Sequence, residues 1–442
     1  MAANLEFGKW LPKLESKLNS LDLEKLSRET GFVKRIALKA NSVEFLMGFF
    51  IAMSVNCISY MNIAFCIGQL IDDTISKMAI KKRFTEGFVN LLQLILSLVL
   101  SDHLKSMPRV MDSDVFSTFK RVFLQDITTI SLPAKLAKFF PGSGTNNGKK
   151  TATLKLQVVY EALRERFFHF GIGCFRDNDQ KAAKDILSIA KAGDLVIRDL
   201  GYFVLEVFAK MIQQGIFLLS RLKYGVNIYV QNGIKQIDLV KLLKKYGQLD
   251  IDVTLGSKTK LPVRLIAIPL PDDVVNERRR KAKLNRDKRL NPDKNHLYLM
   301  GFNIFITNVD RETWSAKQVA QVYEIRWRIE IVFKAWKSYF KITNIPNASV
   351  NRVKANIYAM LIYITLFQIY CFIPLYHQLY EQQQKYLSLI KLTALMKLIQ
   401  VFENEQSINK PFNENRFIQN ILYHCAYEIR NDRQNYPQKI AC

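Results

Sequence analysis

The segment TFKRVFLQDITTI, residues 118–130, marks the point at which the chain changes from a helical to a strand pattern. Two-residue alternation places Val122, Leu124, Asp126 and Thr128 on one side of the expected strand. A helix is expected over 177–193, between an Asp/Asn start and a Gly stop. Strands separated by helices predict an α/β layered domain. The other expected strands are 154–160, 166–172, 194–199, 215–222 and 297–308.

The chain before this segment, residues 1–105, has a helical pattern. Within it, LEKLSRETGFVKRIALKA (23–40) has the outline of a helix-turn-helix: a helix, a tight Gly turn and a basic helix. A solvated basic face on a packing helix is an equally good interpretation. In the first interpretation, four side chains face DNA phosphates or bases: Arg28, Lys34, Arg35 and Lys39.

Residues 224–300 interrupt the α/β pattern with short β stretches and a charge run. The run NERRRKAKLNRDKRLNPDKN (276–295) carries nine basic and three acidic residues. Such a run is usually a solvated face, but its density favours contact with a DNA backbone. The candidate contacts are Arg278, Arg279, Arg280 and Lys281. A long helix over 315–340, an apolar segment over 355–380 and a helical tail complete the chain.

The composition narrows the class of protein. At 442 residues the chain is long enough for two to four structural units, and 49% apolar residues exclude a mainly disordered protein. Lys and Arg outnumber Asp and Glu by 64 to 39, which gives a net charge of +25 and indicates a polyanionic partner. Six Cys without a CxxC pair and five scattered His argue against zinc sites and a disulfide framework, so a reducing cytosol is expected.

Two uncharged runs raise the alternative of a basic membrane protein. Residues 45–71 and 355–380 span 27 and 26 positions without a formal charge. Either is long enough to cross a bilayer core of about 30 Å. Both contain polar side chains, such as Asn56 and Gln368, that are costly in lipid but ordinary in buried helices. The helices of a protein core are the favoured interpretation.

The segment YEIRWRIEIVFKAWKS (323–338) carries the most chemistry. On a helix, Tyr323, Arg326, Glu330 and Lys337 fall within an arc of about 60°. An Arg-x-x-x-Glu pair alone is commonly helix pairing between residues four apart. A tyrosine, two cations and a carboxylate on one face indicate a functional stripe.

Two further carboxylates can converge on Glu330. Asp126 lies inside an apolar strand and Asp199 ends another, where an unpaired charge is costly. Three such carboxylates form an all-oxygen site suited to Mg²⁺. Two ions about 4 Å apart activate a nucleophile and stabilise the leaving oxygen in phosphoryl transfer. Asp112 and Asp114 are alternatives for the first carboxylate.

With these residues in view, the chain resembles a bacterial DDE transposase of insertion-sequence family four. The family signature Tyr-x2-Arg-x3-Glu-x6-Lys is matched by Tyr323, Arg326, Glu330 and Lys337. A second motif, Asp-x-Gly-Tyr/Phe followed by an aromatic, is matched at 199–203. The first motif, Asp-Ser/Thr-Thr, is matched at Asp126 with Ile127 where a hydroxyl residue is usual. The resemblance covers about 110–370.

This resemblance implies an RNase H-like mixed-sheet catalytic core with a β-rich insertion, flanked by helical N-terminal and C-terminal regions. The implied units are a helical DNA-end-binding domain (1–105), the first part of the core (106–223), the β-rich insertion with its basic segment (224–300), the second part of the core (301–380) and a helical C-terminal region (381–442).

The resemblance also implies roles for the site residues. Asp126, Asp199 and Glu330 are the implied catalytic residues and ligands of two Mg²⁺ ions, for which Mn²⁺ can substitute. The implied DNA phosphate contacts are Tyr323, Arg326 and Lys337. Family members hold a flipped base with an aromatic side chain of the insertion side, and Phe302 and Phe305 lie near that place.

The expected protein is therefore a transposase that binds the inverted repeats of its element and catalyses Mg²⁺-dependent DNA cleavage and strand transfer. Its expected partners are double-stranded transposon ends, target DNA and a second copy of itself in the synaptic complex, with no membrane. The expected location is the bacterial cytoplasm, in association with the nucleoid. The alternative is a catalytically inactive DNA-binding derivative, for which Ile127 is the sequence hint.

Overall fold

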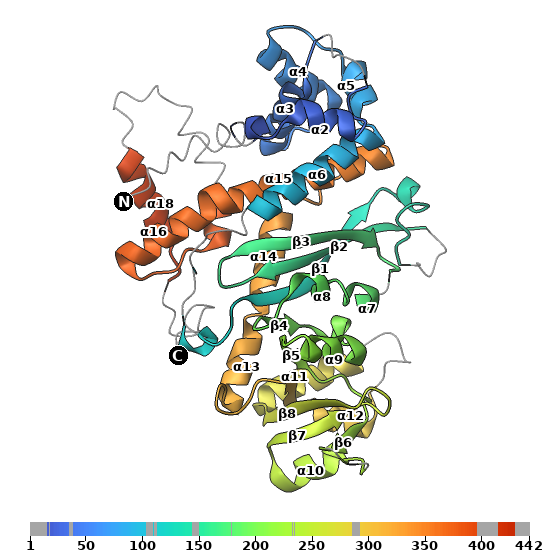
Figure 1. The fold of residues 1–442 in the computed structure, drawn as a ribbon, viewed down its shortest axis with the longest axis vertical. Coiled ribbons are helices and arrows are strands. Elements are labelled where there is room, and N and C mark those ends of the chain that lie inside the picture. The colour runs from blue at the N-terminus through green and yellow to red at the C-terminus, as the bar shows by residue number, and fades with distance from the viewer. Residues whose placement is uncertain are drawn as a thin grey trace.

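A nine-stranded mixed sheet forms the centre of the molecule (Figure 1). The computed structural model describes residues 16, 18–34, 39–102, 109, 113–143, 150–177, 179–231, 233, 235–284, 292–395 and 414–428. The strand order is β3-β2-β1-β4-β5-β9-β8-β7-β6. The strands are β1 Val122–Leu132, β2 Ala152–Glu161, β3 Arg166–Cys174, β4 Leu195–Arg198, β5 Phe217–Arg221, β6 Ile228–Val230, β7 Leu249–Leu255, β8 Leu261–Pro269 and β9 Phe302–Thr307.

The first five strands in this order carry the expected core. β1 pairs antiparallel with β2, and β2 pairs antiparallel with β3. On its other side β1 runs parallel to β4, and β4 runs parallel to β5. Three antiparallel strands followed by two parallel ones form an RNase H-like core, so the predicted fold class is confirmed.

The strands of the expected insertion extend this same sheet. β9, from the expected second part of the core, pairs antiparallel with β5, and the insertion strands β8, β7 and β6 follow outward in antiparallel pairs. Arg264 of β8 is buried and donates to both carboxylate oxygens of Asp250 at 2.8 and 2.7 Å. It also donates to the carbonyls of Asp310 and Trp314 at 3.0 and 2.7 Å. The insertion is thereby tied to the segment that leads into the functional helices.

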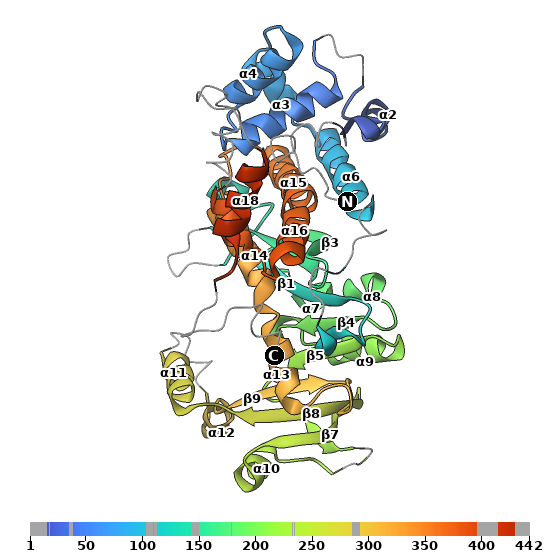
Figure 2. The ribbon, with the colours of Figure 1, turned by 90° about the vertical axis from the view of Figure 1, so that its left-hand side faces the viewer.

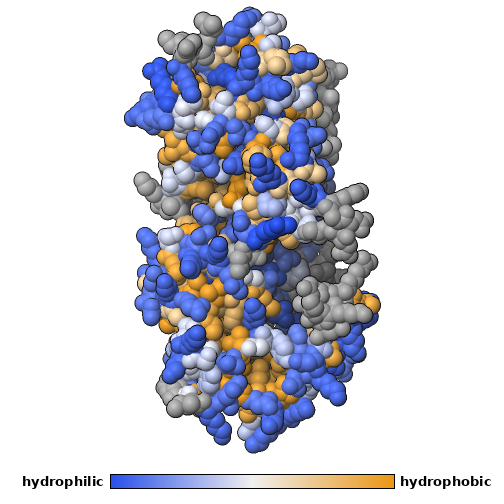
Figure 3. Space-filling model, turned by 90° about the vertical axis from the view of Figure 1, so that its right-hand side faces the viewer, coloured by the Kyte–Doolittle hydropathy of each residue, from blue (hydrophilic) through white to orange (hydrophobic). Residues whose placement is uncertain are grey.

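Helices cover both faces of the sheet. Alternate residues of β1 point into two cores: Val122 and Leu124 into one, and Phe123 into the other. Helices α14 and α15 lie on the first face and α7, α8 and α9 on the second (Figure 2). The space-filling view shows hydrophilic side chains over much of one long side, with apolar patches between them (Figure 3).

The described helices have these bounds: α2 Leu23–Glu29, α3 Ser42–Ser54, α4 Tyr60–Ile71, α5 Lys77–Arg83, α6 Glu86–Asp102, α7 Asp179–Ala182, α8 Ile186–Ile189, α9 Leu205–Gln213, α10 Leu239–Tyr246, α11 Asp272–Lys283, α12 Lys294–Leu299, α13 Ala316–Glu324, α14 Trp327–Ser338, α15 Val350–Phe367, α16 Ile373–Gln383 and α18 Glu414–Cys425. A π-helix, Gln368–Phe372, joins α15 to α16.

Three expected elements are divided in the structure. The helix expected over 177–193 is two single turns, α7 and α8. Where α7 ends, the carbonyls of Ala182 and Ala183 accept from Gln125 at 3.1 Å and from Arg198 at 2.6 Å, so side chains of the sheet hold the break between the two turns. The strand expected over 297–308 is the end of α12, a turn at Gly301 and then β9. The helix expected over 315–340 breaks between α13 and α14.

The helix-turn-helix prediction is wrong in its second helix, as far as residues 23–34 and 39–40 describe it. The first helix, α2, ends at a turn in which Gly31 has a φ of 73°, but residues 32–34 and 39–40 are not helical. Phe32 packs instead against Phe45 and Phe88, with ring centroids 5.6 and 4.8 Å apart. The next helix is α3, which is apolar rather than basic. Arg35 lies outside the described residues.

The two uncharged runs fall on helices of different length. Residues 45–71 are divided between α3 and α4, both shorter than a membrane span. Within the described ranges, one helical run, Val350–Gln383, is long and apolar enough to cross a bilayer by length and composition, and 78% of its most apolar window is buried inside the protein. Helices α5 and α6 pass the same test together, with a 67° bend between them.

Candidate active site

The sheet places Asp126 beside Asp199. β1 and β4 run parallel with Gln125 opposite Arg198, so the next residues are Asp126 on β1 and Asp199, still extended, directly after the end of β4. Neighbouring parallel strands in register point their side chains to the same face. Leu124 and Ile197, two residues earlier, lie in the core that contains α14. Both aspartates therefore face α14.

Arg326 connects Asp126 of β1 with Glu330 of α14. Its Nη1 lies 3.2 Å from Asp126 Oδ2, and its Nη2 lies 2.9 Å from Glu330 Oε1. The side chains of Arg326 and Asp126 are 12% and 14% exposed, against 36% for Glu330. The charge of Asp199 acts on both Asp126 and Arg326. One guanidinium thus gathers carboxylates that are about 200 positions apart in the sequence.

The setting of Asp126 opposes its ionisation. Burial raises the pKa of this carboxyl group to about 6. The backbone N–H of Ile127, 2.8 Å from Oδ1, and the Arg326 guanidinium lower the pKa, but only in part. The negative charges of Asp199 and Glu330 raise it further. Such a cluster of carboxylates is stable with cations beside it.

The pKa values of Arg326 and Tyr323 are both raised, which suits anion binding. Burial lowers the pKa of Arg326, but the surrounding groups outweigh burial and leave the pKa above its usual value. Burial and the charge of Asp199 raise the pKa of Tyr323, so its hydroxyl stays protonated. The Tyr323 ring packs against buried Phe305 at 5.0 Å between centroids. The site combines a permanent cation with a neutral hydroxyl donor.

Lys337 lies on α14 seven residues after Glu330, about two helical turns along the same face. Its side chain is half-buried. The four residues of the Tyr-Arg-Glu-Lys stripe therefore extend from the aspartates of the sheet along α14. Because the helix breaks before α14, they do not share one straight helix.

The carboxylates have the chemistry of a hard-cation site. Among the described residues, however, there is no group of three or more His, Cys, Asp or Glu side chains arranged to hold a metal ion. Asp126 and Glu330 instead contact the Arg326 guanidinium, which supplies the balancing charge. Carboxylate oxygens are the ligands that Mg²⁺ and Mn²⁺ prefer, so the donor set fits such ions if Arg326 moves aside.

A family model described as "Transposase DDE domain" matches residues 117–366, more than half of the chain. The chain belongs to the DDE transposase family. The matched range contains Asp126, Asp199 and Glu330, and it begins after Asp114. The predicted resemblance to a bacterial insertion-sequence DDE transposase is confirmed at this level, and members of such a family act on DNA.

Curated relatives show the same kinship. A transposase for insertion sequence element IS231F of Bacillus thuringiensis subsp. israelensis is 29% identical over 98% of this chain and 94% of its own length. The IS231B transposase of Bacillus thuringiensis subsp. berliner is 31% identical over 77% of this chain and 75% of its own length. A cryo-EM structure of a piggyBac transposase synaptic complex with hairpin DNA is 10% identical, covers 99% of this chain and 89% of that chain, and has a TM-score of 0.42.

The basic residues of the N-terminal region differ in their contacts. Arg28 on α2 and Lys34 after it are exposed. Lys39 contacts Asp73 Oδ2 at 2.8 Å and donates to the carbonyl of Thr74 at 3.0 Å. Part of the charge of Lys39 is therefore balanced within the protein.

The basic run on α11 also has structural contacts. Arg278 donates to Asn303 Oδ1 at 2.8 Å, and Arg279 donates to the carbonyl of Leu297 at 2.9 Å. Burial lowers the pKa of Arg278. Arg280 and Lys281 lie 2.7 and 3.3 Å from carboxylate oxygens of Glu277 on the same helix. Two of the four cations thus connect α11 to β9 and α12.

The alternative first carboxylates are placed differently. Asp114 is exposed at the start of a short 3₁₀ turn, Asp114–Phe116, before β1. Asp112 lies outside the described residues.

The two aromatic candidates for holding a flipped base differ in burial. Phe305 is buried behind Tyr323, and Phe302 is half-buried against Tyr298, with ring centroids 5.6 Å apart.

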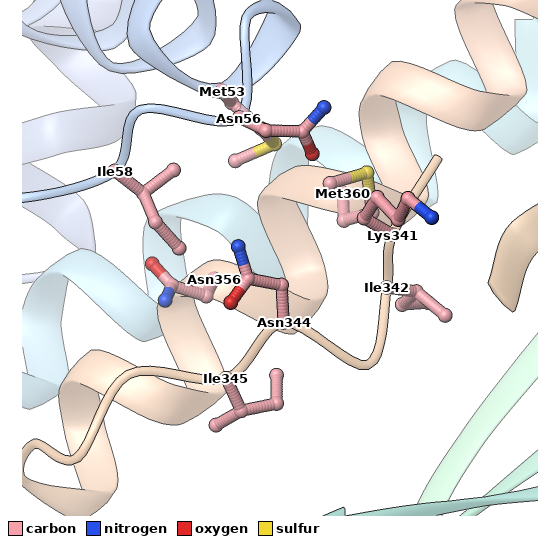
Figure 4. A pocket seen from close by; sticks show the side chains of 9 residues that line it. All are labelled: Met53, Asn56, Ile58, Lys341, Ile342, Asn344, Ile345, Asn356 and Met360. Atoms are coloured by element: carbon pink, nitrogen blue, oxygen red, sulfur yellow. The ribbon is translucent and has the colours of Figure 1, made fainter. Parts of the chain in front are cut away.

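A cavity of about 20 Å³ lies where the N-terminal helices meet the core (Figure 4). Its lining includes Asn56 from the end of α3, Asn344 from the loop after α14, and Asn356 of α15. The Asn356 amide is buried, and neither of its polar atoms has a hydrogen-bond partner in the described part of the chain. The residues that line this cavity do not include the three carboxylates, so it is separate from their site.

Sequence reasoning missed two residues near the carboxylates. Trp327 follows Arg326, is 58% exposed, and has its ring centroid 5.6 Å from the Arg326 guanidinium. Arg221 ends β5 opposite Phe305, and its charge lowers the pKa of Tyr323. Trp327 could have been recognised from the sequence, because it stands between two arginines on the helix that was expected to carry the functional residues. Nothing in the sequence connected Arg221 with Tyr323, about 100 positions away.

Proposed function

We propose that this transposase binds the inverted repeats of its insertion sequence, cuts the DNA to release the 3′ ends of the element, and joins these ends to target DNA. The observation that supports the proposal is the meeting of Asp126 and Glu330 at Arg326, with Asp199 on the adjacent strand, inside a DDE transposase domain.

Asp126, Asp199 and Glu330 are the proposed ligands of two Mg²⁺ ions, with Mn²⁺ as a substitute. Such ions, when bound, generate a nucleophile from water near neutral pH and stabilise the leaving oxygen. Because Asp126 is buried and flanked by like charges, the carboxylates gain from a divalent cation that replaces the single charge of Arg326.

Arg326 then becomes available to the DNA. In the proposal its guanidinium turns from Asp126 and Glu330 to a phosphate beside the scissile bond, where a planar fork can bind two oxygens. Tyr323 donates its hydroxyl to the same backbone, because its raised pKa keeps it protonated. Lys337 contacts a phosphate further along α14.

Cleavage hydrolyses a phosphodiester bond, strand transfer exchanges one phosphodiester bond for another, and neither step needs a nucleotide cofactor. In cleavage, a water oxygen attacks phosphorus, the P–O3′ bond at the element's end breaks, and the products are a free 3′-OH and a 5′-phosphate. In strand transfer, that 3′-OH attacks a target phosphate, a new P–O3′ bond forms, and the displaced target strand leaves with its own 3′-OH.

The proposed partners follow from this reaction. Double-stranded DNA supplies the two ends and the target, and the net charge of +25 favours its binding. Two ends require two active sites, so a homodimer is proposed in the synaptic complex. The proposed place of action is the bacterial nucleoid in the cytoplasm, without a membrane.

A plasmid-nicking assay tests this function. The substrate is a supercoiled plasmid that carries the element's ends, incubated with Mg²⁺ or Mn²⁺. Glu330→Gln removes one carboxylate charge and is expected to slow nicking at least about 100-fold while end binding is retained. Glu312→Gln, at an exposed glutamate before α13, is the matched control. Unchanged nicking by Glu330→Gln would refute the assignment.

The same assay separates the proposal from a catalytically inactive DNA-binding derivative. The departure at Ile127 motivates that alternative, since its N–H bonds Asp126 Oδ1 but its side chain offers no hydroxyl. End binding by the wild-type protein without nicking in either metal would favour the inactive derivative.

A further inference from the structure

The helix that carries Glu330 is joined to α13 by a short turn of 3₁₀ type rather than by an unbroken α-helix. Between α13 and α14 the N–H groups of Ile325, Arg326 and Arg328 bond to carbonyls three residues earlier, at 3.1, 3.1 and 2.8 Å. This tighter spacing interrupts the α-helical pattern at Arg326. Because α14 is not a direct α-helical continuation of α13, side-chain contacts can add to what fixes the rotation of α14 about its axis.

Arg328, in the first turn of α14, makes such a contact. Its side chain and that of Glu165 are each 1% exposed. The pair is bidentate: Nε lies 2.8 Å from Oε1 and Nη2 lies 2.8 Å from Oε2. Burial lowers the pKa of Arg328, but Glu165, Tyr427 and Tyr160 together outweigh burial and keep the pKa above its usual value. The guanidinium stays charged inside the protein.

Glu165 is itself held from several sides. It lies in the turn between β2 and β3 with a φ of 53°, a conformation that few residues with side chains adopt. The Tyr160 hydroxyl donates to its carboxylate, and Gln368 of the π-helix donates to its carbonyl at 2.8 Å. From the C-terminal region, the Tyr427 hydroxyl accepts from Arg328 Nη1 at 3.4 Å.

A buried ion pair seldom adds net stability compared with an apolar pair of similar size. The location of the Arg328–Glu165 pair suggests a role in orienting α14. Arg328 precedes Glu330 by two residues, so the two side chains lie about 200° apart around the helix. Holding Arg328 against the β2–β3 turn on one side directs Glu330 toward Asp126 and Arg326 on the other.

We propose that the Arg328–Glu165 pair is a positioning device that fixes the rotation of α14 and thereby aims Glu330 at the aspartates of β1 and β4. This inference rests on the proposed function. Arg328 and Glu165 are positioning residues, since they act on the reaction through Glu330. The π-helix and the C-terminal residue Tyr427 contribute by holding the pair in place.

The test compares a broken pair with a replaced pair. Arg328→Met leaves Glu165 buried and unpaired, so Tm is expected to fall. Glu165→Leu/Arg328→Met replaces both charges with apolar groups, and Tm is expected to recover most of that loss. If the pair only stabilises the fold, activity recovers with Tm. If it positions Glu330, end binding stays near wild type while single-turnover cleavage remains about 100-fold slower.

A second readout does not depend on cleavage. Mn²⁺ affinity of the DNA-free double variant, measured by electron paramagnetic resonance, is expected to fall about tenfold, because misplacing a ligand weakens metal binding. The control is Asp238→Asn/Lys241→Gln, which removes an exposed ion pair of 3.7 Å at the start of α10 and should alter neither readout. A folded double variant with wild-type Mn²⁺ affinity and cleavage would overturn the inference.

Arg328→Lys keeps the test open if the double variant does not fold. It retains the buried charge but not the bidentate geometry. It is expected to fold, to bind ends, and to show reduced Mn²⁺ affinity and slower cleavage, and wild-type values for both would overturn the inference. If the wild-type protein itself cleaves nothing in either metal, the proposed function fails, and the Mn²⁺ affinities still decide the inference.

Discussion

At the scale of single residues, Asp126 is placed for chemistry at the expense of stability. Its pKa is raised from 3.8 to about 6, so the folded protein holds the proton more tightly than the unfolded chain. That contribution to stability is fully present below about pH 4 and is lost as the pH rises through about 6. Above this window, ionisation of the Asp126 carboxyl group has lowered the free energy of unfolding by roughly 3 kcal/mol.

Asp126→Asn should therefore separate stability from activity. In divalent-free buffer at about pH 8, we expect a Tm a few degrees above that of the wild type, because the amide resembles the protonated acid. At about pH 5 the difference should largely vanish, since the wild-type carboxyl group is mostly protonated there. Nicking should be lost at either pH.

Thermal unfolding monitored by circular dichroism at the two pH values provides the measurement. Asp114→Asn, at an exposed aspartate on the approach to β1, is the control and should show no such pH-dependent gain. A lower Tm for Asp126→Asn at the higher pH would show that its contact with Arg326 outweighs the cost of burial.

The sequence was sufficient to place the two aspartates but not to find their partner. Asp126 and Asp199 could be predicted because each interrupts or ends an apolar strand, and parallel neighbours bring such positions together. A helical projection put Arg326 and Glu330 on one face. It could not show that Arg326 reaches Asp126, because that contact depends on how α14 crosses the sheet.

At the scale of elements, two expected helices are divided in the structure. An Asp/Asn start and a Gly stop predicted one helix over 177–193, and the helical pattern predicted another over 315–340. At the first, Gln125 and Arg198 from neighbouring strands take the carbonyls of Ala182 and Ala183. Long-range hydrogen bonds of this kind leave no trace in a local pattern, whereas the sheet strands, with strong alternation or apolar runs, could be predicted.

The contact between α2 and α6 offers a test at this scale. Gly87 near the start of α6 lies against the turn after α2. A Cβ at Gly87 would lie 2.4 Å from the carbonyl carbon and oxygen of Gly31 and 2.6 Å from the N of Phe32. Because these are backbone atoms, Gly87→Ala should destabilise the N-terminal helices by about 1–3 kcal/mol.

Limited proteolysis and Tm measure this effect. Gly171→Ala on β3 is the matched control, because its nearest neighbour would lie at an ordinary 3.5 Å. Equal behaviour of the two variants would mean that the α2 turn adjusts freely on α6.

At the scale of the whole molecule, the carboxylates occupy the middle of an elongated body. The N-terminal helices α3 and α4 lie at one end and the insertion, with α10 and β7, at the other (Figures 1 and 2). The nine-stranded sheet connects the core with the insertion without an interruption. A DNA duplex that reaches the carboxylates can therefore extend toward both ends, and a charge of +25 supports many phosphate contacts.

Salt dependence tests this picture of extended contact. If about six to ten phosphates are neutralised, the dissociation constant for duplex DNA should rise by roughly 10³- to 10⁵-fold between about 50 and 200 mM KCl.

Lys337→Gln should reduce the slope of log K against log salt by about one, because it removes one proposed phosphate contact. Lys39→Gln should leave the slope nearly unchanged, because Asp73 at 2.8 Å already balances that charge. Fluorescence anisotropy with a labelled duplex measures all three slopes. A shallow wild-type slope would contradict the extended contact, and equal losses in the two variants would remove Lys337 from the proposed phosphate contacts.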